Sequence, residues 1–166
     1  MSRFDKESKD FIERDVVSDS LNLYDLDSKS INISELSNSV DILITYSNYN
    51  LPLNLSALNG FINEVNKSNF SGNILLAKIP GGAFELPLLS EYIITQIKPK
   101  IAVFLGCIIK GETSHYEFLS STVINAIRNL SVSSKLPIVN GVLTVESIKQ
   151  AIDRAGINQN KGKEFG

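Results

Sequence analysis

Residues 106–118, with the sequence GCIIKGETSHYEF, have the types and spacing of a site that binds a phosphate and transfers protons. Lys110, Gly111 and Thr113 suit a phosphate, because that anion is bound well by a lysine, a hydroxyl and the free N–H groups at the start of a helix. His115 is the single histidine of the chain. From the first turn of a helix it could transfer protons to and from a molecule held by its phosphate. The pattern indicates the layout of an active site.

The same residues also have structural explanations. A lone histidine in the first turn of a helix is more often a surface residue or part of a satisfied cap than a catalyst. Units of strand, glycine, loop and helix are also general features of doubly wound α/β proteins. Cys107 follows a buried strand, where a small apolar side chain is a more natural role than a nucleophile. The motif alone leaves these interpretations open.

The flanking sequence predicts a buried strand before the motif and a helix after it. Residues 101–105, IAVFL, form an apolar block typical of a strand buried on both faces, and Gly106 is expected to end it. Thr113 or Ser114 would cap the helix. Its buried face is predicted from apolar residues at three- and four-residue steps: Tyr116, Leu119, Val123, Ile124 and Ile127.

Three further strands, each followed by a helix, are predicted at residues 40–45, 73–79 and 136–142. Thr144 is expected to cap the last helix, with Gly156 as its stop. Four alternating units predict an α/β fold, a four-stranded parallel sheet flanked by helices on both faces in a flavodoxin-like three-layer sandwich. The inward residues of the first two helices would be Leu55, Leu58, Ile62 and Val65, and then Leu88, Leu89, Tyr92, Ile93 and Ile97.

Composition excludes several classes of protein. The net charge of −2 provides no basic excess to bind a nucleic acid or an acidic membrane. One cysteine and one histidine exclude an internal disulfide and an ordinary metal cluster. No apolar run approaches the roughly 18 residues of a membrane helix, and the charged N-terminus lacks the apolar core of a signal peptide. A cytoplasmic protein with one domain is expected.

Residues 1–35 differ from the rest of the chain. Charges of both signs alternate first, and Ser, Asn and Asp with scattered leucines follow. Because no sustained period and no glycine occur there, a flexible or partner-docked N-terminal arm is predicted, with no strand in it. Residues 36–166 would form the α/β domain.

Three predicted loops bring polar and aromatic residues to the carboxyl edge of the sheet, where ligands of such sheets bind. Residues 110–115 form the third loop. Single residues have ordinary explanations, since Glu85, for example, is favoured at a helix start by the dipole. Together the loops indicate a pocket for a flat heterocycle and a phosphate. The first two loops carry Tyr46, Ser47, Tyr49 and Asn50, and then Gly82, Ala83, Phe84 and Glu85.

Three motifs in this order resemble the lumazine synthase family, which catalyses the penultimate step of riboflavin biosynthesis. They are residues 82–87, GAFELP, residues 106–116, GCIIKGETSHY, and residues 141–144, GVLT, with 150–156, QAIDRAG. The resemblance covers residues 40–162. It implies a transferase that condenses 5-amino-6-(D-ribitylamino)uracil with 3,4-dihydroxy-2-butanone 4-phosphate to 6,7-dimethyl-8-ribityllumazine, with release of phosphate and water. No metal or organic cofactor is implied.

The resemblance also implies a role for each matching residue. His115 would be the catalytic proton shuttle, and Tyr49 would stack on the pyrimidine, where the family usually has phenylalanine or tryptophan. The phosphate would be bound by Gly111, Glu112 and Thr113 together with Arg154, whose guanidinium suits that anion. The remaining substrate-binding positions would be Ser47, Asn50, Ala83, Phe84, Glu85, Gly106, Ile108, Ile109, Lys110 and Asn140.

The sequence departs from the family pattern in several places. Glu112 replaces a small residue and brings a carboxylate near the expected phosphate, and Asn140 stands where many relatives have an aromatic residue. Asn158 falls near a usual lysine, in a slightly shorter loop. Relatives continue beyond the position of Gly166, so the domain is expected to lack their final C-terminal helix.

The resemblance implies a homo-oligomer, either a pentamer or an icosahedral shell, with active sites shared between subunits. Two alternatives without turnover stay open, a flavin- or lumazine-binding protein of the same fold and a shell-forming protein. The presence of His115, Arg154, Tyr49, Glu85 and Thr113 together favours the enzyme, because a passive binder needs no proton shuttle.

Overall fold

The computed structural model of the chain describes residues 22–25, 36, 39–156 and 160–166. Their strands form one sheet in the order β1-β3-β2-β4-β5, and every pairing is parallel. The predicted parallel α/β fold is confirmed. The strands are β1 (Asn22–Asp25), β2 (Ile42–Ser47), β3 (Asn73–Ile79), β4 (Ile101–Ile109) and β5 (Ile138–Val145).

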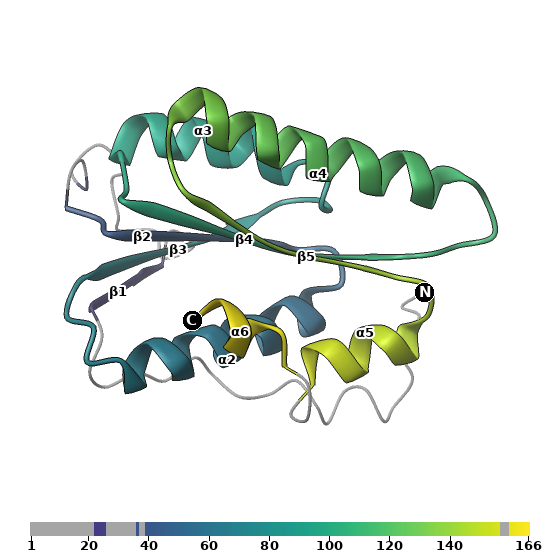
Figure 1. Cartoon of the computed structure of the whole chain (residues 1–166), viewed down its shortest axis with the longest axis horizontal. Helices are drawn as coiled ribbons and strands as arrows, with labels where there is room; N and C mark the ends of the chain where they lie inside the picture. The colour runs from purple at the N-terminus through teal and green to yellow at the C-terminus, as the bar shows by residue number, and fades with distance from the viewer. Residues whose placement is uncertain (1–21, 26–35, 37–38, 157–159) are drawn as a thin grey trace.

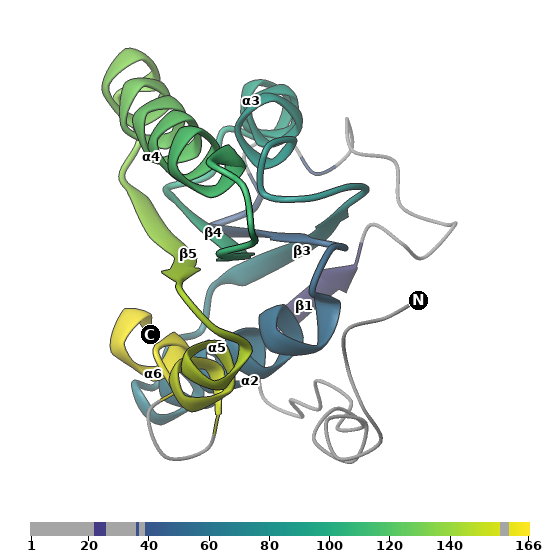
Figure 2. The ribbon, with the colours of Figure 1, turned by 90° about the vertical axis from the view of Figure 1, so that its right-hand side faces the viewer.

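Helices cover both faces of the sheet, as predicted (Figure 1). On one face lie α3 (Leu86–Ile97) and α4 (His115–Ser134). On the other face lie α2 (Leu51–Lys67), α5 (Ile148–Ala155) and the short α6 (Gly162–Phe165), as the view along the layers also shows (Figure 2). The three layers are therefore helices, sheet and helices.

The central strand β4 is buried on both faces, which explains its unbroken apolar sequence. Phe104 packs in the core on the side of α3 and α4, with Ile93 and Ile127. Its neighbours Val103 and Leu105 pack on the opposite side, in the core beneath α2. Successive side chains of a strand point to opposite faces, so a strand between two helix layers needs apolar residues at every position.

Strand β4 continues past Gly106 to Ile109, so the prediction that this glycine ends the strand is wrong. Pairing with β5 also continues, from Gly106 opposite Val142 to Ile109 opposite Val145. A Cβ atom at residue 106 would lie 3.1 Å from Leu86 Cδ1. The glycine therefore serves close packing between the strand and α3, not a turn.

The start of the last helix also differs from the prediction. Thr144 lies in β5, paired with Ile108, and does not cap α5. Ser147 is the N-cap, and its Oγ accepts a hydrogen bond of 3.2 Å from the N–H of Gln150. The strand runs on because its pairing with β4 satisfies the backbone groups that a helix would otherwise use.

The buried face of α3 differs from the predicted one. The helix begins at Leu86, which is fully buried, and Leu88 and Tyr92 are 71% and 63% exposed. Its buried residues are Leu86, Ser90, Ile93, Ile94 and Ile97. On α4, likewise, Ile124 is exposed, whereas Val123 and Ile127 are buried as predicted. With Leu86 inward, the helical period turns Leu88 and Tyr92 away from the sheet.

Strand β1 lies in the segment for which no strand is predicted. It pairs with β3, in a register that sets Asn22 opposite Asn73 and Asp25 opposite Leu76. Four residues are too few for an alternating pattern to stand out, so only the pairing reveals this edge strand. The rest of the predicted arm lies outside the described residues. Leu36, the first residue of the predicted domain, packs against the core.

The C-terminal stretch contains α6, which packs beside α2. The expected lack of the family's final helix stays a prediction, and Asn158 lies outside the described residues. Among the described helices, none combines the length and the apolar character that crossing a membrane would require.

Candidate active site

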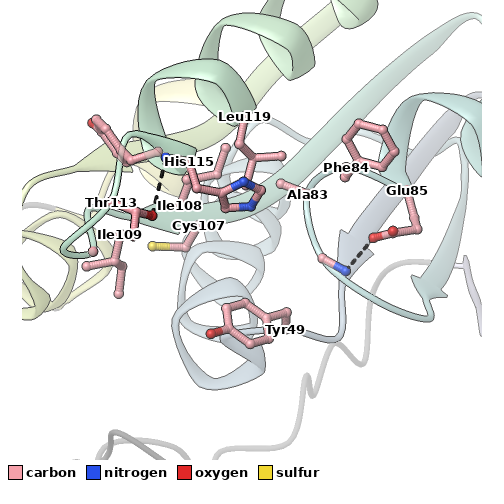
Figure 3. Close-up of a pocket in the computed structure, with 13 residues that line it drawn as sticks. Tyr49, Ala83, Phe84, Glu85, Cys107, Ile108, Ile109, Thr113, His115 and Leu119 are labelled. Atoms are coloured by element: carbon pink, nitrogen blue, oxygen red, sulfur yellow. Dashed lines mark hydrogen bonds between the residues drawn. The ribbon is translucent and has the colours of Figure 1, made fainter.

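A cavity of about 610 Å³ opens at the carboxyl edge of the sheet (Figure 3). Its wall comes from the loop after β2, the loop after β3, the end of β4 and the first turns of α4. The predicted site residues that line it are Tyr49, Ala83, Phe84, Glu85, Ile108, Ile109, Gly111, Thr113 and His115. The three predicted rim loops therefore meet at one cavity.

Hydrogen bonds join the three loops behind the cavity. The N–H of Tyr49 donates to the carbonyl oxygen of Gly81, at 2.8 Å. Asn50 Nδ2 donates to the carbonyl oxygen of Cys107, at 2.9 Å. The loop that carries Tyr49 is thus tied both to the loop after β3 and to β4, which fixes the relative positions of the cavity walls.

The glycines of the loop after β3 have a conformational role. Gly81 has a φ of 99°, a backbone conformation that residues other than glycine rarely adopt. The N–H of Gly82 donates to Glu85 Oε2, at 2.7 Å (Figure 3). Glu85 is therefore engaged in holding its own turn, at the N-cap of α3.

His115 is the first residue of α4, as predicted, and its side chain is exposed at the cavity. Ser114 is the N-cap, but its side chain makes no capping hydrogen bond. The N–H of His115 lies 3.4 Å from Thr113 Oγ1, a long contact. The start of α4 therefore faces the cavity with donor groups that its own side chains satisfy only weakly.

Three predicted substrate-binding residues lie behind the cavity wall and support it. Ser47 is fully buried, and its Oγ donates to the carbonyl oxygen of Tyr49, at 3.1 Å. Asn50 anchors its loop to β4, as described above. Gly106 allows α3 to approach β4 closely. None of the three lines the cavity.

Four other predicted residues are not brought to the cavity by the single chain. Lys110 Nζ lies 3.5 Å from Glu117 Oε1 and 4.0 Å from Glu146 Oε1. Glu112 and Asn140 are exposed, and Arg154 is half-buried near the end of α5. Arg154 belongs to α5, which lies on the face of the sheet opposite α4 (Figure 2), and it does not line the cavity of its own chain.

Several lining residues have no predicted role in substrate binding or catalysis. Gly82 belongs to the predicted rim, whereas Tyr116 and Leu119 are assigned to a helix face and Cys107 to a buried strand end. The spacing could have revealed Leu119, because it lies four residues after His115 and shares its side of the helix.

Cys107 is buried, and burial raises the pKa of its thiol to about 12. A nucleophile or a metal ligand must be the thiolate, which such a pKa makes negligible near neutral pH. Cys107 therefore contributes an apolar part of the wall, in agreement with its predicted role. In the described ranges, no group of three or more His, Cys, Asp or Glu residues could hold a metal ion.

A comparison with protein families identifies a match. The sequence model of 6,7-dimethyl-8-ribityllumazine synthase matches residues 39–166. This range contains the strands β2 to β5, their helices and every lining residue of the cavity. It also contains the three motifs of the sequence, and it covers well over half of the chain. The protein therefore belongs to the 6,7-dimethyl-8-ribityllumazine synthase family, a family of transferases in riboflavin biosynthesis.

Proposed function

We propose that this protein condenses 5-amino-6-(D-ribitylamino)uracil with 3,4-dihydroxy-2-butanone 4-phosphate to 6,7-dimethyl-8-ribityllumazine, with release of phosphate and water. The observation that carries the proposal is the cavity of about 610 Å³, where an aromatic ring, a helix N-terminus and the histidine of the chain meet. Its volume lies in the range of roughly 300–1,000 Å³ typical of small-molecule sites. Formation of the lumazine from the two substrates, followed by absorbance, tests the proposal.

Tyr49 and the Ala83–Glu85 turn would bind the pyrimidine and its ribityl chain. The side chain of Tyr49 is 64% exposed at the cavity and so leaves a ring face free for a flat heterocycle. Ala83 lines the same cavity, in the loop whose Gly81 accepts a hydrogen bond from the N–H of Tyr49. Since Glu85 already accepts from Gly82, its second carboxylate oxygen would be the one to meet a polar group of the substrate.

Gly111, Glu112 and Thr113 would bind the phosphate through N–H groups at the start of α4, with the Thr113 hydroxyl as a further donor. These residues are exposed, and α4 is a helix of 20 residues whose dipole favours an anion at this end. The carboxylates of Glu117 and Glu146 lie near Lys110 Nζ. The lysine would therefore have to move away from them to contact the phosphate. Arg154 of a neighbouring subunit would complete the site.

His115 would transfer protons in two steps. When the amine of the uracil attacks the ketone and forms the imine, the nitrogen loses two protons in all and the carbonyl oxygen gains two, so that it leaves as water. A proton is then removed from the carbon beside the one that bears the phosphate, and the electron pair expels phosphate. Both steps move protons without net oxidation, so a positioned imidazole supplies the chemistry that they need.

The exposed apolar side chains of α3 and α4 support assembly into a homo-oligomer. Phe84, Leu88 and Tyr92 are four residues apart and form an exposed stripe, which continues the wall of the cavity. Phe118 and Val132 are exposed on α4. Apolar side chains gathered in this way indicate a protein interface. We propose that a neighbouring subunit covers them, in a pentamer or an icosahedral shell.

Substitution of Tyr49 separates stacking from hydrogen bonding. Tyr49→Phe is expected to bind the pyrimidine almost as the unchanged protein does, whereas Tyr49→Ala should weaken binding severalfold or more. Stacking contributes on the order of 1 kcal/mol beyond buried area and does not need the hydroxyl. Calorimetry with the pyrimidine alone measures both variants. Equal losses for Phe and Ala would show that the phenol forms a hydrogen bond and that the stacking role is wrong.

Substitution of Leu88 tests the interface. Burial of a leucine contributes roughly 1.5–3 kcal/mol, and a charge in its place would resist desolvation. Leu88→Asp is therefore expected to shift the protein to smaller assemblies and to reduce turnover, while Leu88→Ala has a smaller effect. Sedimentation velocity measures the mass. Lys67→Asp, on the opposite face of the sheet, serves as the control, and an unchanged mass for Leu88→Asp would contradict the interface.

A further inference from the structure

We propose that Asn54 is a positioning residue, whose buried amide holds the loop between β2 and α2 in the arrangement that presents Tyr49 to the cavity. This inference rests on the function proposed above, because it assigns Asn54 to the binding of the pyrimidine. Asn54 lies in the first turn of α2 and is 2% exposed. Asparagine is a poor helix former, so propensity alone does not explain its place there.

The amide of Asn54 joins the end of β2 to the start of α2. Its Nδ2 donates to the carbonyl oxygen of Ser47, at 2.7 Å, and to that of Tyr49, at 3.0 Å. It also lies 2.9 Å from Ser47 Oγ, which itself donates to the carbonyl oxygen of Tyr49. Carbonyl oxygens can only accept, so the nitrogen and not the oxygen of the amide must face this loop.

The ring of Tyr49 depends on this backbone for its direction. Because 64% of the residue is exposed, packing within the chain does little to fix the ring. Its position follows instead from the backbone of residues 47–50, where Asn50 has a positive φ of 56°. The N–H groups of Asn48 and Tyr49 are tied to Ile79 and Gly81 on one side. The Asn54 amide holds the carbonyl groups on the other side.

Loss of the amide would remove one donor from the buried carbonyl of Ser47 and one from the partly buried carbonyl of Tyr49. The carbonyl of Ser47 would lose its side-chain partner, and that of Tyr49 would keep only the Ser47 hydroxyl. Buried acceptors without partners are unfavourable, so the loop would open toward water. The ring would then spend less time against the cavity, and the pyrimidine would bind more weakly while the phosphate site stayed intact.

The experiment compares Asn54→Ala and Asn54→Ser with a matched control, Asn160→Ala. Asn160 is also a buried asparagine, and its Nδ2 donates to the carbonyl oxygen of Ser56, at 2.8 Å, away from the cavity. Amide hydrogen exchange is measured at the N–H of Tyr49. The N–H of Asp41 is the reference, because it lies at the opposite end of β2 and donates to the carbonyl oxygen of Asn73. Calorimetry measures 5-amino-6-(D-ribitylamino)uracil and the butanone phosphate separately.

Asn54→Ala is expected to accelerate exchange at Tyr49 about tenfold relative to Asp41 and to weaken pyrimidine binding about tenfold, the scale of one buried hydrogen bond. Affinity for the butanone phosphate should stay unchanged. Asn54→Ser, whose hydroxyl can replace the amide as a donor, should show smaller changes of the same kind. If the alanine variant does not fold, the serine variant alone tests the inference. Asn160→Ala should change neither the exchange at Tyr49 relative to Asp41 nor the affinity for the pyrimidine relative to the butanone phosphate, although it lowers stability.

Three results would overturn the inference: unchanged relative exchange at Tyr49, faster exchange with unchanged pyrimidine affinity, or equal losses of affinity for both substrates. The last would mean that Asn54 only maintains the fold. If the unchanged protein binds no pyrimidine, the proposed function fails, and with it the assigned role in substrate binding. The exchange comparison still decides in that case whether Asn54 holds the loop.

Discussion

Replacement of His115 by alanine is expected to slow lumazine formation by about 10²–10⁴-fold and to leave the affinity for both substrates nearly unchanged. His115 begins α4 and lies at the cavity, beside Thr113 and Leu119 (Figure 3). Its loss would remove the group that accepts and returns protons but would leave the ring-binding and phosphate-binding walls in place. We expect the lower end of the range, because both substrates would still be held together.

Single-turnover kinetics and separate binding measurements distinguish these two effects. Added imidazole should restore part of the rate in His115→Ala, because the small molecule can occupy the space of the lost ring. A decrease of less than about threefold would show that the reaction depends on positioning and solvent, not on this proton shuttle. A loss of affinity as large as the loss of rate would instead assign His115 to binding.

Replacement of Arg154 by lysine is expected to weaken binding of the butanone phosphate and of inorganic phosphate by about one to two decades, and to spare the pyrimidine. A guanidinium forms two parallel charge-assisted hydrogen bonds to a phosphate, whereas an ammonium acts as a point charge. Hydrogen bonds to charged groups contribute roughly 1.5–3 kcal/mol, which corresponds to that change in affinity.

The effect of Arg154→Lys requires a second subunit, because a single chain does not bring Arg154 to the cavity. Calorimetry with each ligand measures it, and Arg128→Lys on the exposed side of α4 is the matched control. Equal losses for the phosphate ligands and the pyrimidine would show that Arg154 maintains the fold. No loss for any ligand would remove Arg154 from the site.

The central motif could be predicted from the sequence because its signals are local. Residues 101–105 are apolar throughout, and the three- and four-residue spacing after Ser114 marks a helix, so the cavity position of His115 follows from a strand, a loop and a helix in succession. The sequence also places the loops after β2 and β3 at the same edge, because each follows an apolar strand. Parallel topology then brings them together.

The predictions that are wrong or missing concern residues whose role depends on a partner elsewhere in the fold. Gly106 marks close packing with Leu86, a contact that no local pattern reveals. Thr144 and Ser147 are both good caps, and pairing of β5 with β4 decides between them. Asn54 has no predicted role, because its acceptors come from the turn of the preceding loop.

We propose that the remaining site residues depend on assembly. Arg154 is assigned by its family motif, yet it lies on the face of the sheet opposite α4 (Figure 2). The exposed stripe with Leu88 likewise differs from the predicted inward face. A sequence pattern identifies apolar residues on a helix, but it does not distinguish those that meet the core of the same chain from those that meet a second copy.

The most direct test mixes the purified protein with 5-amino-6-(D-ribitylamino)uracil and 3,4-dihydroxy-2-butanone 4-phosphate, and follows lumazine absorbance and released phosphate together. We predict that both products form in equal amounts, faster than in buffer alone and faster than with His115→Ala. Failure to exceed the rate in buffer, at saturating concentrations of both substrates and with the pyrimidine bound, would contradict the proposed catalysis and would favour a binding protein of the same fold.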